Sequence, residues 1–162
     1  MIAKTNAMRA LDQRKIPYQA FSYDEAVHSA DEVAAILGVS AAQVFKTLVV
    51  LRDNGRALLA VAPGDHELDL KRLAAGAGEK RLRMATKREA EALTGLLTGG
   101  ISSLALLNKG FAVFLDASAR AFDEIYMSAG QRGINLRLRV GDFVKVTGAR
   151  FVEMVRVGGE EE

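Results

Sequence analysis

A single lysine inside an apolar segment constrains this chain more than any other feature. Residues 44–51 read VFKTLVVL, and Lys46 is the only charged residue among them. Because alternate side chains of a strand share a face, Lys46 groups with Leu48 and Val50, and Thr47 lies on the opposite face. Both faces are largely apolar, which indicates a strand buried on both sides. An isolated buried ammonium is costly, so Lys46 either extends from the strand end to water or lies in a cleft.

The composition is that of an ordinary globular protein and excludes several kinds of site. The chain has 162 residues, which fits one domain. It has no cysteine, so disulfides, a thiol nucleophile and a thiolate metal site are excluded. His28 and His66 lie far apart and no HExxH motif is present, so we expect no metal and no other cofactor. The N-terminus lacks a signal-peptide core and no apolar stretch is long enough to span a bilayer. We therefore expect a cytoplasmic protein without membrane contact.

Helix caps and turns divide the chain into interspersed helices and strands. Capping-box patterns begin at Ser29 and Thr86, and Asp-Asn-Gly at 53–55 is typical of a hairpin turn. Hairpins mixed with helices favour a single α+β domain over a doubly wound parallel sheet. The expected helices span 4–15, 30–37, 68–75, 86–93 and 141–146, and the expected strands span 18–23, 44–51, 57–62, 81–84, 111–115, 122–129, 135–140 and 151–157.

Two glycine-rich segments are candidates for a ligand site. Residues 94–103 read TGLLTGGISS and match neither a Walker A motif nor GxGxxG. Adjacent glycines let the backbone approach a ligand closely and turn its N–H groups inward, although they equally suit a tight helix-to-strand connection. Residues 128–133 read SAGQRG, which is either a similar backbone-rich corner or a simple turn. Ser128 lacks the G-x-S-x-G pattern and a histidine partner, which argues against a serine hydrolase.

Charged residues are unevenly distributed, although the net charge is only +2. Asp116 ends the apolar FAVFLD segment and is either a buried partner for a cation or the start of a turn. Clusters of basic residues bind phosphate backbones or simply lie on solvated faces, and the sequence leaves both interpretations open. The clusters comprise Arg72, Lys80, Arg81, Arg83, Lys87 and Arg88 in the middle, and Arg132, Arg137, Arg139, Lys145 and Arg150 toward the C-terminus.

Taken in order, VFKTLVV, TG-x-x-x-GGIS and IY-x-S-x-G-x-RG resemble the YbaK/EbsC family. Its members are freestanding relatives of the editing domain inserted in bacterial prolyl-tRNA synthetases. The resemblance covers nearly the whole chain, including the DEVAAILG and LDLKRLA helices and the GDFVKVTGARF segment. It implies an α+β domain over residues 1–157, with a mixed, mostly antiparallel sheet or pseudo-barrel and surrounding helices, followed by an acidic tail at 158–162.

The resemblance implies a function in translation fidelity. Family members hydrolyse the ester that joins a wrong amino acid to the terminal adenosine of a tRNA, and the best-known ones remove cysteine from tRNA for proline. The implied partners are the acceptor end of a mischarged tRNA and prolyl-tRNA synthetase. The implied catalytic residues are Lys46, Gly100, Ile101 and Ser102, and the implied substrate-binding residues are Tyr23, Thr47, Gly99, Ser128, Gly130, Arg132, Gly133 and Asn135.

Two positions depart from the family pattern and bear on the substrate. Ser103 replaces the usual proline after the glycine loop, which suggests a looser loop. Asn135 replaces an aspartate that related members often carry, which removes a candidate negative partner for Lys46. Without a thiol or a triad, the attacking group is water or a group of the substrate itself. We expect Lys46 to anchor the nucleotide or carbonyl oxygen, and the N–H groups of residues 100–102 to form an oxyanion hole. The alternatives are activity on alanine or serine, and a non-catalytic module that binds tRNA or a synthetase.

Overall fold

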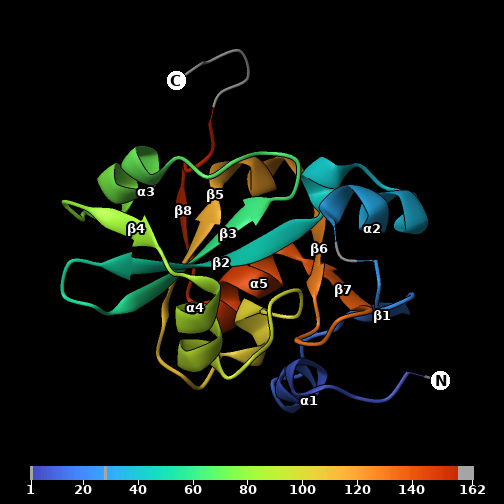
Figure 1. Ribbon diagram of the computed structural model, residues 1–162. Coiled ribbons are helices and arrows are strands. Elements are labelled where there is room, and N and C mark those ends of the chain that lie inside the picture. Colours follow the sequence, from blue (N-terminus) through green and yellow to red (C-terminus); the bar gives the residue numbers. More distant parts are fainter. Residues whose placement is uncertain (1, 28, 157–162) are drawn as a thin grey trace.

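The computed structural model describes residues 2–27 and 29–156, and it contains two β-sheets with helices packed around them (Figure 1). The larger sheet has the strand order β4-β2-β3-β5-β8 and the smaller one β1-β7-β6. The predicted tail at 158–162 lies outside the described residues. The strands are β1 (Gln19–Ser22), β2 (Phe45–Arg52), β3 (Ala57–Pro63), β4 (Leu82–Met84), β5 (Ala112–Asp116), β6 (Glu124–Ser128), β7 (Ile134–Arg139) and β8 (Arg150–Val152). The helices are α1 (Asn6–Gln13), α2 (Ala30–Leu37), α3 (Leu70–Ala77), α4 (Lys87–Thr94) and α5 (Val140–Thr147), with 3₁₀ turns η1 (Ala41–Gln43), η2 (Ser103–Ala105) and η3 (Ala117–Ala121).

Most of the strand pairs are antiparallel, as the sequence predicts. β2 pairs antiparallel with β3 and β4, and β7 pairs antiparallel with β1 and β6. β5 is parallel to both of its neighbours, β3 and β8. An isolated parallel bridge between Val44 and Tyr126 joins the start of β2 to β6. The α+β fold is confirmed, and within the described residues the expected pseudo-barrel takes the form of two adjoining open sheets.

The register of the long β2–β3 hairpin is set by its turn. Gly55 has φ +82°, a conformation that glycine adopts at little cost. The Arg52 N–H donates to the Arg56 carbonyl oxygen at 2.9 Å, and the Asn54 side chain accepts the Arg56 N–H at 2.9 Å. This turn pairs Lys46 with Ala62, so the lysine lies near the far end of the hairpin.

The core explains why β2 is apolar on both faces. Val49 packs into a large cluster between the two sheets, together with Leu136 and Leu138 of β7. Val50 points the other way, into a cluster that includes Leu73 of α3. The prediction of a strand buried on both sides is therefore confirmed, and Lys46 is the charged exception at its beginning.

The predicted helix caps are present. The Ser29 hydroxyl accepts the Glu32 N–H at the start of α2, and Thr86 forms a complete capping box at the start of α4. Gly38 and Gly95, both in the left-handed conformation, end these two helices. None of the described helices has the length and apolar character that a membrane span requires.

The predicted end of the third helix is wrong. Gly76 does not stop α3; the helix continues to Ala77 and ends at Gly78, which has φ +75°. A Cβ at position 76 would lie 2.2 Å from Val152 Cγ1. Gly76 therefore allows α3 to pack closely on β8, and it does not end the helix.

The predicted last strand, 151–157, is also too long. β8 ends at Val152, and the Met154 N–H then donates to Asp116 Oδ1 at 3.0 Å. Asp116 Oδ2 accepts the Ser118 N–H at 3.1 Å. The buried Asp116 carboxylate thus holds two backbone segments, which supports the turn interpretation and not the cation-partner one.

Candidate active site

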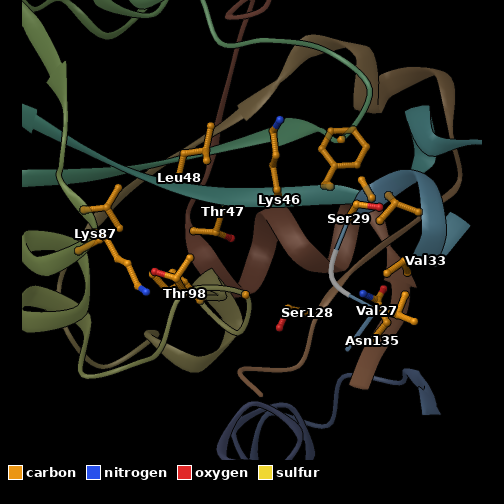
Figure 2. Close-up of a pocket in the computed structure, with 18 of the residues that line it drawn as sticks. Val27, Ser29, Val33, Lys46, Thr47, Leu48, Lys87, Thr98, Ser128 and Asn135 are labelled. Carbon is orange, nitrogen blue, oxygen red and sulfur yellow. The ribbon is translucent and has the colours of Figure 1, made fainter. Parts of the chain in front are cut away.

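A cavity of about 500 Å³ lies along the first half of β2 (Figure 2). Its lining comes from β2, from residues around the start of α2, from the start of α4, from the glycine-rich loop and from β6 and β7. Elements far apart in the chain therefore converge on the segment that carries Lys46. The polar side chains of the lining are those of Tyr23, Ser29, Lys46, Thr47, Lys87, Thr98, Ser128 and Asn135.

On the side of β2 that faces away from β3, the segment around Thr47 has no strand partner among the described strands. β4 pairs only with residues from Val50 to Arg52, and the adjoining Val49 carbonyl accepts the Ala85 N–H at 3.0 Å. Backbone groups alternate in direction along an antiparallel strand, so the N–H and C=O of Thr47 face the same side as those of Val49. No strand pairs with Thr47 on that side in the part of the chain that is described. The cavity therefore borders backbone groups that are able to bind a ligand.

Lys46 and Thr47 leave opposite sides of β2, as the strand pattern predicts (Figure 2). The Lys46 ammonium donates to the His66 carbonyl oxygen at 3.1 Å. An ammonium has three N–H donors, so this contact leaves two for a ligand. Lys46 is half-buried and lines the cavity.

The two glycine-rich segments meet directly. Arg132 Nε donates to the Thr98 carbonyl oxygen at 2.8 Å. A Cβ on Gly99, which has φ +94°, would lie 2.9 Å from Arg132 Nε, and one on Gly100 would lie 3.1 Å from the Gln131 Cα. The loop therefore needs glycine at both positions in order to pack closely against residues 131–132.

Hydrogen bonds within the loop determine which amides remain available. The Gly100 N–H donates to the Leu97 carbonyl at 2.9 Å, and the Ser103 N–H donates to Thr47 Oγ1 at 3.1 Å. No described residue accepts the N–H of Ile101, which lines the cavity, or of Ser102, which is fully buried. Of residues 100–102, Ile101 is thus the best-placed backbone donor.

Tyr23 and Asn135 form a polar pair at one end of the cavity. Asn135 is 4% exposed, and its Nδ2 donates to the Tyr23 hydroxyl oxygen at 3.4 Å. Burial raises the pKa of Tyr23, an effect that the contact with Asn135 partly opposes. Gly133 positions this pair, because its carbonyl accepts the Tyr23 N–H at 2.9 Å. A Cβ on Gly133 would lie 2.9 Å from the backbone carbonyl oxygen of Tyr23.

The structure gathers most of the predicted site residues but not all. Gly100, Gly130 and Arg132 line a second cavity, and Ser102 and Gly133 line neither cavity. The residues that do line the first cavity are Tyr23, Lys46, Thr47, Gly99, Ile101, Ser128 and Asn135.

Sequence reasoning missed the contribution of α2. Val27, Ala30 and Val33 line the cavity beside Ser29, yet nothing in the local pattern distinguishes them from ordinary core positions. The helical spacing of Ala30 and Val33 was the available signal, because it places both on one face. Lys87, which belongs to a predicted basic cluster, also lines the cavity.

The described residues show no metal centre. No group of three or more histidine, aspartate or glutamate side chains lies close enough to hold a metal ion among them. His66 Nδ1 instead contacts the neighbouring Asp65 carboxylate at 2.6 Å. His28 lies outside the described residues.

Comparisons with known proteins agree with this architecture. The model of the aminoacyl-tRNA editing domain family matches residues 24–146. The chain is 38% identical over 153 residues, 93% of each chain, to EbsC of Enterococcus faecalis, provisionally named a Cys-tRNA(Pro)/Cys-tRNA(Cys) deacylase. It is 30% identical to the multifunctional Ser/Thr-tRNA deacylase ProXp-y of Escherichia coli, covering 82% of this chain and 81% of that one. A crystal structure described provisionally as a trans-editing enzyme for prolyl-tRNA synthetase has a TM-score of 0.83 at 25% identity, over 96% of this chain and 100% of that one. The chain therefore belongs to the aminoacyl-tRNA editing domain family.

Proposed function

We propose that this protein is a trans-editing deacylase that hydrolyses the ester of a misacylated tRNA carrying a small amino acid, with cysteine on tRNA for proline as the expected substrate. The observation that most supports this proposal is the charge of the cavity. Lys46 and Lys87 line it, and no carboxylate is among the described lining residues. Such a cavity suits an anionic or electron-rich ligand, as the phosphate and ester of an aminoacylated tRNA end are. Family membership and the deacylase names of two relatives support the same assignment.

Backbone amides supply the proposed oxyanion hole. The Gly100 N–H donates to the Leu97 carbonyl, whereas the Ile101 N–H has no acceptor among the described residues. The Thr47 N–H points away from β3, toward the side of β2 that lacks a strand partner there. A donor directed at a developing oxyanion contributes about 3 kcal/mol to transition-state stabilisation. Lys46, with two free N–H donors, adds charge at the carbonyl oxygen or at the terminal phosphate.

The attacking group comes from solvent or from the substrate. Aliphatic hydroxyl groups line the cavity at Ser29, Thr47, Thr98 and Ser128, but no histidine or carboxylate of the described lining is there to activate them. Water adds to the ester carbonyl, the bond to the ribose oxygen breaks, and the ribose oxygen takes the proton. The products are the free amino acid and the uncharged tRNA.

The test is deacylation of Cys-tRNA for proline by the wild type, Lys46→Met and Lys71→Met. Methionine keeps the apolar stem, so the fold is retained, and Lys71 is an exposed residue of α3 that lines no described cavity. We expect Lys46→Met to lower kcat/KM at least about a hundredfold, the order of one lost oxyanion contact, and Lys71→Met to leave it unchanged. Full activity of Lys46→Met contradicts the site. If the wild type binds the tRNA tightly without hydrolysing it, the protein is a binding module and not an enzyme. Added prolyl-tRNA synthetase tests the proposed partner.

A further inference from the structure

A glutamate of α4 holds the glycine-rich loop by its backbone. Glu91 Oε2 accepts the Thr98 N–H at 2.8 Å, and Arg132 Nε donates to the Thr98 carbonyl oxygen at 2.8 Å. Two charged side chains from distant parts of the chain therefore bind the N–H and the C=O of one residue. Hydrogen bonds with an ionised partner are stronger than neutral ones, so the loop is anchored at Thr98. Thr98 also lines the proposed active-site cavity, beside Lys87 (Figure 2).

The position of Glu91 in α4 shows that its carboxylate does not serve the helix. Glu91 lies in the last turn of α4, which ends at Thr94 and has no basic residue in that turn. A negative charge there is unfavourable, because the peptide dipoles concentrate negative charge at the C-terminal end of a helix. The Thr98 N–H first, and then the charges of Lys87 and Arg132, lower the pKa of Glu91. Contact with the loop and its surroundings therefore keeps this carboxylate ionised.

The proposed oxyanion donor lies between two anchored residues of the loop. The Ile101 N–H has no acceptor among the described residues. Ile101 follows the anchor at Thr98 and precedes Ser103, whose N–H donates to Thr47 Oγ1 at 3.1 Å. The residues between Thr98 and Ile101 are both glycines, and glycine is the most permissive residue for backbone conformation. The direction of the Ile101 N–H therefore depends on how firmly the two anchors hold the segment.

From these contacts, and resting on the function proposed above, we propose that Glu91 is a positioning residue, which holds the loop so that the Ile101 N–H points at the carbonyl oxygen of the ester. Glu91 lines none of the described cavities, so it acts through Thr98 and not on the substrate. A misplacement of about 1 Å caused by a change outside the reacting groups costs on the order of a hundredfold in rate. A contact at the surface thus has a large effect on turnover and a small one on the stability of the fold.

The experiment compares Glu91→Gln, Glu91→Leu and Glu153→Leu in the hydrolysis of Cys-tRNA for proline. Glutamine keeps an oxygen that accepts the Thr98 N–H, and leucine removes it at similar size. The Glu153 side chain is 82% exposed and lines no described cavity, so its substitution controls for the loss of a surface carboxylate. We expect Glu91→Leu to lower kcat about ten- to a hundredfold. Its KM should change less than about threefold, because a contact that matters only in the transition state lowers kcat and kcat/KM equally. Glu91→Gln should restore most of the activity, and Glu153→Leu should match the wild type.

Two further measurements separate positioning from a loss of folding. Urea denaturation should give midpoints close to that of the wild type for all three variants. Hydrogen exchange of the amides of residues 96–101 should become faster in Glu91→Leu and stay unchanged in Glu153→Leu. If the wild type hydrolyses no ester, the proposed function fails, and the exchange measurement still tests the anchor: unchanged exchange in Glu91→Leu contradicts it.

Three results would overturn the inference while leaving the deacylase assignment intact. The first is a Glu91→Leu variant with the kcat of the wild type. The second is a loss of activity that appears in KM alone, which would mean that Glu91 affects substrate binding and not the transition state. The third is a Glu91→Gln variant as impaired as Glu91→Leu, because glutamine keeps the hydrogen-bond acceptor on which the positioning depends.

Discussion

At the scale of residues, the buried contact between Thr47 and Ser103 attaches the glycine loop to β2. The Ser103 N–H donates to Thr47 Oγ1 at 3.1 Å, and both residues are at most 9% exposed. A proline at position 103, as in the family pattern, has no N–H to donate. The loop that the sequence suggested to be looser is therefore held by a hydrogen bond that this chain gains from serine.

Replacing Thr47 tests this attachment. Thr47→Val keeps the shape of the side chain and leaves the Ser103 N–H buried and unpaired, so we expect a loss of about 1–3 kcal/mol in the free energy of unfolding. Ser103→Ala is the matched control, because it keeps the N–H and removes only the hydroxyl, which contacts the Thr47 hydroxyl at 3.5 Å and Met127 Sδ at 4.0 Å. Its expected loss is under about 1 kcal/mol. Urea denaturation measures both, and equal losses would show that the hydroxyl contact and not the amide bond holds the loop.

Single residues also show where sequence reasoning stops. The alternation of a strand correctly places Lys46 and Thr47 on opposite faces, because that property is local. The partner of the Gly100 N–H is a carbonyl three residues away, and the conformation of the loop decides this pairing. The conformation in turn depends on Arg132 and Gln131, which are more than thirty positions later in the chain.

At the scale of elements, the start of α4 is fixed by charge as well as by its cap. Arg83 forms two hydrogen bonds with the Glu89 carboxylate, at 2.9 and 2.8 Å, and Glu89 also accepts the Thr86 N–H at 2.9 Å. These contacts, with that of Arg83 first, lower the pKa of Glu89 to about 2. Because α4 begins at Lys87, the same contacts position a lysine that lines the cavity.

The lowered pKa predicts a pH-dependent contribution to stability. A carboxylate with a folded pKa of about 2 and an ordinary value of 4.5 stabilises the fold above pH 4.5, and this contribution is lost as the pH falls toward 2. Glu89→Gln keeps the capping group but not the charge. We therefore expect the wild type to exceed Glu89→Gln in urea midpoint at pH 7, and the difference to shrink between pH 4.5 and 2. Arg83→Gln removes the cation that pairs with Glu89, so it should lower the urea midpoint at pH 7 by most of the amount that Glu89→Gln does. A difference in urea midpoint between the wild type and Glu89→Gln that stays constant with pH would contradict the charge interpretation.

Elements were predicted well where the signal is local and poorly where packing decides. The capping patterns at Ser29 and Thr86 correctly mark the starts of α2 and α4, because caps act within one turn. Gly76 looks like a helix end in sequence, and only its contact with Val152 reveals that it is an interior packing position. The parallel pairing of β3, β5 and β8 likewise depends on contacts between distant segments.

At the scale of the whole molecule, we expect the attraction for tRNA to depend on local charge and not on the net charge. The net charge is only +2, and several arginines of the basic clusters are engaged within the protein. Arg83 binds Glu89, and Arg137 lies near Glu124 and above the Phe21 ring. Lys46 and Lys87, by contrast, share one cavity without an acidic neighbour in its described lining. Phosphate binding is therefore expected to depend on few residues.

This distribution predicts how the affinity for tRNA responds to salt. Each lysine that neutralises a phosphate releases counterions, so removing it should lower the slope of log affinity against log salt by about 0.7 for a single-stranded end. We expect Lys87→Gln to weaken binding of uncharged tRNA and to reduce the slope by about that amount. Lys71→Gln has the same change in net charge, on a residue outside the cavity, and should leave the slope unchanged. Equal effects of the two substitutions would mean that the whole surface, and not the cavity, attracts the nucleic acid. An effect confined to Lys87→Gln would place the phosphate at the α4 end, opposite Asn135, and so fix the direction in which the substrate lies.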